Sequence, residues 1–102
     1  MAPNVTEIKD ITKIDSENKE YYSLAGELII KNLSENRYPH QDLFKSYKEV
    51  SLGKLTNIDS AGIAYLALIK SHNKNINFIE IPNKVSTLSD LYGLNKILGL
   101  EG

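Results

Sequence analysis

The apolar positions of this 102-residue chain fall into short runs separated by polar stretches, and the runs predict alternating strands and helices. A first strand is expected near residues 5–14. A second is expected over residues 21–28, where aromatic and alternating apolar side chains are typical of a strand. The polar residues 16–18 between them favour a turn, so the two strands are predicted to form a β-hairpin. Residues 29–37 fit either a loop or a partly buried segment.

A helix is predicted over residues 39–48. Pro39 suits the first helical turn, because the N–H that proline lacks would have no partner there in any case. Leu43, Phe44 and Tyr47 then fall on one helical face, which we expect to be buried.

The next two elements meet at the dipeptide Asp59-Ser60. A strand is expected over residues 50–58, and Gly53 inside it indicates a bulge or a close approach of another segment. Aspartate and serine are good helix N-cap residues, so a helix is expected to run from about residue 61 to 72.

The last part of the chain predicts one more strand and helix. The strand is expected over residues 76–81, and Asn83 is expected to cap a short helix that ends at Gly93. The apolar side chains of residues 94–102 indicate that this tail packs on the domain. The residues of that helix expected on its buried side are Val85, Leu88, Leu91 and Tyr92.

The order of elements is therefore β-β-α-β-α-β-α, which predicts an α/β fold. Strands that alternate with helices favour a partly parallel, mixed β-sheet with the helices packed on it. A chain of this length fits one domain, residues 1–102, and leaves little room for a deep substrate cleft.

Composition narrows the classes of function. The net charge of −1, from 12 basic and 13 acidic side chains, gives no electrostatic basis for binding nucleic acid. The absence of cysteine excludes disulfides, thiolate metal sites and cysteine nucleophiles. His40 and His72 are interpreted as surface residues without metal-ligand spacing, so no metal or cofactor is expected. With no apolar run long enough to span a bilayer and no apolar leader segment, the chain is expected to be soluble, cytoplasmic and not inserted in a membrane.

The Asp59-Ser60 turn has three candidate uses. It can simply cap the helix, with Ala61 and Gly62 letting the helix start close to the strand. It can attract an anion, although Asp59 is itself negative and the loop lacks the glycines and lysine of a phosphate-binding loop. It can also dock a partner protein. No histidine motif lies near the turn to complete a hydrolase site, so the chain is not expected to be an enzyme.

The helix after the turn favours docking because it is apolar on two sides. At 100° per residue, one face carries Ile63, Leu66 and Ile69. The opposite face carries Ala61, Ala64, Tyr65 and Leu68. In so small a domain a partner protein could cover the second face. Against this, single apolar residues are common on protein surfaces.

The same stretch resembles the signature of the STAS family, named after sulphate transporters and anti-sigma-factor antagonists. The matching positions are a strand followed by Asp59, Ser60, Ala61, Gly62 and Ile63. Residues 26–28, with the sequence GEL, and residues 88–94, with the sequence LSDLYGL, match the early strand and the last helix of the family. The resemblance covers about residues 20–100.

Within that family the chain is most similar to the small STAS subunits of bacterial ABC transporters that move phospholipids. The resemblance implies a non-catalytic subunit that binds the transporter's ATPase subunit at the inner membrane. The contact residues implied for that role, together with the outward-facing Ala64, are Asp59, Ser60, Ala61, Gly62, Ala64, Tyr65 and Leu68. Association of the chain with itself through this helix stays open.

Two departures from the family pattern bear on the alternative role, that of an anti-sigma-factor antagonist. Ser51-Leu52 stands where the family commonly has Asp-Leu. Antagonists commonly carry two hydroxyl residues after the aspartate, whereas here Ala61 follows Ser60. Ser60 is therefore the one candidate phosphorylation site of this turn, and a phosphate there would add nearly two negative charges beside Asp59.

Overall fold

The computed structural model describes residues 21–100. Its elements, in chain order, are β1 (Tyr21–Leu28), α2 (Ile30–Ser34), the 3₁₀ helix η1 (Gln41–Ser46), β2 (Glu49–Ile58), α3 (Ser60–His72), β3 (Asn77–Ile79), α4 (Asn83–Leu91) and α5 (Asn95–Leu98). The predicted strand near residues 5–14, and with it the hairpin, lies outside the described residues.

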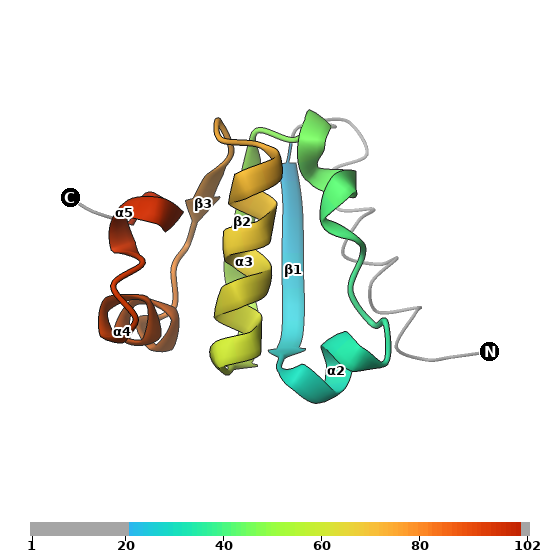
Figure 1. The fold of residues 1–102 in the computed structure, drawn as a ribbon. Helices are drawn as coiled ribbons and strands as arrows, with labels where there is room; N and C mark the ends of the chain where they lie inside the picture. The colour runs from blue at the N-terminus through green and yellow to red at the C-terminus, as the bar shows by residue number, and fades with distance from the viewer. Residues whose placement is uncertain (1–20, 101–102) are drawn as a thin grey trace.

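The three strands of the described part form one parallel sheet in the order β1-β2-β3. Tyr22 pairs with Val50, and Val50 pairs with Phe78, so β2 is the central strand. Helix α3 lies across the sheet and runs antiparallel to the strands (Figure 1). The fold is thus a small α/β domain, as the alternation of strands and helices predicts.

The expected irregularity at Gly53 is present. Between the pairs Ser23–Ser51 and Ala25–Lys54, β2 advances by one residue more than β1. A Cβ atom on Gly53 would lie 3.1 Å from the Cβ atom of Glu80, so the position is also close to the segment after β3. Both readings of this glycine, a bulge and a close approach, are confirmed.

The core lies between the sheet and α3. Ile63, Leu66 and Ile69 of α3 are buried, as their helical spacing predicts. A group of aromatic rings continues the core beside β1: the ring of Tyr22 meets those of Phe44 and Tyr47 edge to face, with centroids 5.0 and 5.5 Å apart.

The predicted helix over residues 39–48 is a shorter 3₁₀ helix, η1, and one of its expected core residues is exposed. Three residues per turn bring positions three apart into line. Phe44 is therefore buried and Tyr47 half-buried, whereas Leu43 points to the surface. The His40 side chain caps η1 by accepting a hydrogen bond from the Asp42 N–H at 3.2 Å.

Helix α4 differs from the prediction at its N-terminus and in which of its residues are buried. Pro82, not Asn83, occupies the N-cap position, and no side chain caps the helix there. Gly93 has a φ of 69° just after the helix, so the predicted C-terminal glycine is confirmed. Val85 is buried and Leu88 half-buried, but Leu91 and Tyr92 lie on the surface, and Ser89, four residues after Val85, is the other buried residue of this helix.

Candidate docking site on helix α3

The Asp59 carboxylate joins two helices at the carboxyl end of the sheet. Its Oδ1 accepts a hydrogen bond from the Gly62 N–H at 3.0 Å, which caps α3 as the sequence predicts. Its Oδ2 accepts a second bond from the Ile30 N–H at 2.9 Å, at the first residue of α2. Both oxygens are thus engaged within the chain, and Asp59 shapes the turn that presents Ser60.

Gly62 is a packing position. It is buried, and a Cβ atom there would lie 2.1 Å from the Leu28 carbonyl oxygen and 2.6 Å from Cγ1 of Ile58. Only glycine lets the first turn of α3 approach the ends of β1 and β2 this closely. This close packing confirms the interpretation that Gly62 lets the helix start near the strands, and the contact of Gly62 with a partner stays a prediction.

Tyr65 does not belong to the outward face either. Its side chain is only 7 % exposed, and its hydroxyl donates a hydrogen bond to the Pro39 carbonyl oxygen. The segment that leads into η1 folds over this side of α3, and helical spacing alone could not reveal that cover. Burial raises the pKa of the Tyr65 phenol, and the nearby Tyr22 and Tyr38 raise it further.

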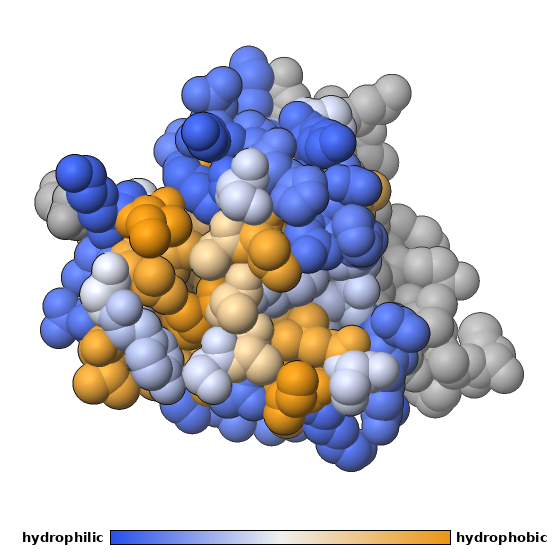
Figure 2. Space-filling model, viewed as in Figure 1, coloured by the Kyte–Doolittle hydropathy of each residue, from blue (hydrophilic) through white to orange (hydrophobic). Residues whose placement is uncertain are grey.

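Four of the other residues predicted to contact a partner lie on the outward side of α3. Ser60, Ala64 and Leu68 are exposed, and Ala61 is half-buried. Leu68 is 44 % exposed, whereas the other large apolar side chains of this helix are buried. Figure 2 shows apolar and pale residues gathered over α3 on this face, with strongly polar residues toward its C-terminal end. We call Ser60, Ala61, Ala64 and Leu68 the α3 face.

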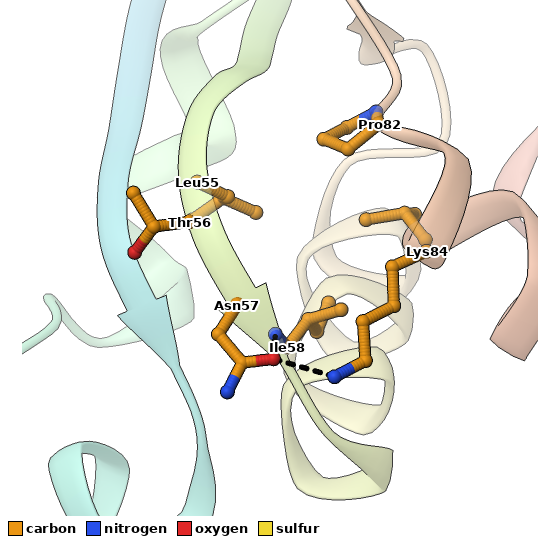
Figure 3. A pocket seen from close by; sticks show the side chains of 7 residues that line it. Leu55, Thr56, Asn57, Ile58, Pro82 and Lys84 are labelled. Atoms are coloured by element: carbon orange, nitrogen blue, oxygen red, sulfur yellow. Dashed lines mark hydrogen bonds between the residues drawn. The ribbon is translucent and has the colours of Figure 1, made fainter.

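A small pocket lies between the end of β2 and the start of α4 (Figure 3). Its volume is about 50 Å³, and the amine of Lys84 donates a hydrogen bond across it to Asn57 Oδ1. Ligand sites usually measure about 300–1,000 Å³, so this space holds a few water molecules at most.

The structure brings together two histidines that the sequence analysis treated separately. His40 Nδ1 lies 3.5 Å from Asp42 Oδ2, and His72 Nε2 lies 3.4 Å from Asp42 Oδ1. The two imidazoles come from the N-cap of η1 and the last residue of α3, 32 residues apart in sequence, and no local pattern predicts that they meet. Across residues 21–100, no group of three or more histidine, cysteine or acidic residues is arranged to hold a metal ion.

Asn73 is a further residue that sequence reasoning missed. Its side-chain amide donates hydrogen bonds to the carbonyl oxygens of Phe44 at 2.9 Å and Tyr47 at 2.7 Å. These carbonyls belong to the end of η1, where carbonyl oxygens have no N–H donor within the helix. Asn73 therefore fastens η1 to the C-terminal end of α3, beside the buried flank of that helix.

Comparison with known proteins finds no protein-family model and no curated protein that matches the chain. None of the helices within residues 21–100 is long and apolar enough to cross a membrane.

Proposed function

We propose that this chain is a non-catalytic interaction subunit that docks on the ATPase subunit of a bacterial phospholipid ABC transporter. The sequence resemblance is closest to MlaB, the STAS subunit of the Mla system, and its partner would be an MlaF-like ATPase. The chain would then lie at the cytoplasmic side of the inner membrane, bound through that ATPase and indirectly to its permease. Its contribution would be to outer-membrane lipid asymmetry.

The observation that carries the proposal is the exposed apolar surface of the α3 face. Leu68 is 44 % exposed and Ala64 lies one turn earlier on the same side of the helix. An apolar side chain held on a rigid, core-packed helix costs little conformational entropy to bury against a partner. The small residues around Leu68 leave room for a partner side chain to come close.

Docking would act on the ATPase in two ways. A subunit that binds only the folded ATPase stabilises it by mass action. It also shifts the ATPase between conformations, by the difference in its affinity for them. Neither effect requires a reacting group on this chain.

A pull-down with a tagged chain from its native cell tests the proposal, with Leu68→Asp beside the wild type. We expect an ABC ATPase and its permease to co-purify with the wild type and to be lost with Leu68→Asp. Leu91→Asp is the matched control, because Leu91 is also an apolar surface residue, 71 % exposed, but lies on α4. Circular dichroism of both variants should match the wild type. Equal recovery of the ATPase with Leu68→Asp would contradict the assignment.

One observation favours a second candidate function, that of an anti-sigma-factor antagonist switched by phosphorylation. Ser60 is exposed at the first residue of α3, where the partial positive charge of a helix N-terminus favours a phosphate. In that case the same pull-down would recover a serine kinase or an anti-sigma factor, and mass spectrometry would find phosphate on Ser60.

A further inference from the structure

A second surface, beside the α3 face, lies in the groove between the C-terminal end of α3 and helix α5. The groove has a volume of about 370 Å³ and is lined by Ala67, Lys70, Ser71, Lys74 and Ile97. Ala67, Lys70 and Ser71 lie three and four residues apart on α3, Lys74 follows in the turn after that helix, and Ile97 of α5 forms the opposite wall. Figure 2 shows this face hollowed between the residues over α3 and the apolar residues over α5.

The walls of the groove are apolar. Ile97 is 55 % exposed although its neighbour Leu98 is buried, so α5 turns one large aliphatic side chain into the core and one toward the groove. On the facing wall Ala67 is half-buried and small, which leaves the volume between the two helices open. A side chain of leucine or phenylalanine size fits such a space and would be largely removed from water there.

The rim of the groove is positively charged. Among the described residues that line it, Lys70 and Lys74 are charged and none is acidic, and α3 carries no acidic side chain. The amine of Lys70 is held in place because it donates a hydrogen bond to the Ile76 carbonyl oxygen. These lysines also offset the partial negative charge at the end of α3, but that role does not require an apolar groove between them and α5.

We propose that this groove binds a segment of a partner protein in which an apolar side chain is flanked by aspartate or glutamate. The apolar side chain would fill the space between Ala67 and Ile97, and the carboxylates would pair with the lysine amines. A second copy of the chain is disfavoured, because a symmetric contact would bring the same lysines together. The proposal does not depend on which protein binds the α3 face.

Selection of peptides from a random phage-displayed library on the full chain tests the proposal. We expect the enriched peptides to share acidic residues beside an apolar one, and to shift the NMR signals of the groove residues. Their affinity should fall at least tenfold with Lys74→Glu and with Ile97→Glu, and should weaken as salt is added. Lys84→Glu, a lysine outside the groove, is the matched control and should bind as the wild type does.

Charge reversal gives the sharpest readout. A selected peptide whose acidic residues are replaced by lysine should bind Lys74→Glu better than it binds the wild type. Failure to enrich acidic peptides, or equal binding by Lys74→Glu and the wild type, would overturn the proposal. A wild-type dimer that becomes a monomer in Ile97→Glu would also overturn the proposal. So would binding of phosphatidylglycerol vesicles to the groove when peptides do not bind there.

Discussion

At Gly62 the first turn of helix α3 lies directly against the ends of β1 and β2. The Leu28 carbonyl oxygen stands 2.1 Å from where a Cβ atom would be, and a backbone atom cannot move aside as a flexible side chain can. A substitution at this position therefore tests whether glycine is needed here for packing of the domain.

Gly62→Ala should destabilise the domain by about 3 kcal/mol, near the upper end of usual overpacking costs. Helix propensity alone would predict a gain of about 1 kcal/mol for the same change. Urea denaturation followed by circular dichroism measures the difference. Ala64→Gly, two residues later on the exposed side, is the control and should cost about 1 kcal/mol by lost propensity alone. A Gly62→Ala variant as stable as the wild type would show that the close contact is not limiting.

At the scale of elements, the Asp59 carboxylate connects α2 to α3 by accepting one hydrogen bond from each helix. Helix α2 has five residues and no side-chain cap of its own, so the bond from its Ile30 N–H to Asp59 is a specific anchor. Helices this short are not stable alone in water. The position of α2 is thus set by a residue 29 places later in the chain.

Two substitutions at Asp59 should separate the two bonds. Asp59→Asn retains one acceptor oxygen for the Gly62 N–H, but its amide nitrogen cannot accept from the Ile30 N–H, so we expect a loss of about 1 kcal/mol. Asp59→Ala loses both bonds and should cost about 2 kcal/mol. Urea denaturation gives both values, and amide hydrogen exchange in α2 should speed up in each variant. Equal stability of the two variants would contradict the inference that each carboxylate oxygen of Asp59 contributes a separate stabilising hydrogen bond.

The elements also show what the sequence could and could not predict. Strand β2, helix α3, the Asp59 cap and the buried row Ile63, Leu66 and Ile69 follow from local spacing, and the structure confirms them. Tyr65 was misplaced because its cover comes from a segment about 26 residues earlier. The type of η1 was also missed, and the side chain that binds the carbonyl oxygens at its end, Asn73, lies 26 to 29 residues later in the chain.

For the candidate site, the sequence predicted the turn and the exposed residues Ser60, Ala64 and Leu68, and the structure places them together on one face. It could not predict the α3–α5 groove. That groove exists because Ile97 points outward while Leu98 is buried. The packing of α5 determines which of the two is buried, and the apolar pattern of residues 94–102 does not.

At the scale of the whole molecule, the Tyr65 phenol links global stability to alkaline pH. Its folded-state pKa is raised above the ordinary value of 10.0, so the unfolded chain releases this proton at a lower pH than the folded domain does. The stability that this group supports is complete below pH 10 and is lost as pH rises above it.

The free energy of unfolding should therefore fall by up to about 1.4 kcal/mol per pH unit above pH 10 on account of Tyr65. Tyr65→Phe removes that contribution, so its stability should depend less steeply on pH between 10 and 11. At neutral pH the variant should be about 1 kcal/mol less stable, because the Pro39 carbonyl oxygen loses its donor. Urea denaturation at each pH measures both effects, and parallel pH profiles would contradict the linkage.

The central place of β2 also governs the order in which the domain can assemble. Tyr22 pairs with Val50 and Val50 with Phe78, so each parallel partner lies 28 residues further along the chain. During synthesis, β1 leaves the ribosome well before the strand that completes its parallel pairing, and Tyr22, Leu24 and Leu28 have no sheet partner in β2 until then. Because loop closure must precede such distant pairings, this small domain should fold more slowly than a helical bundle of equal length.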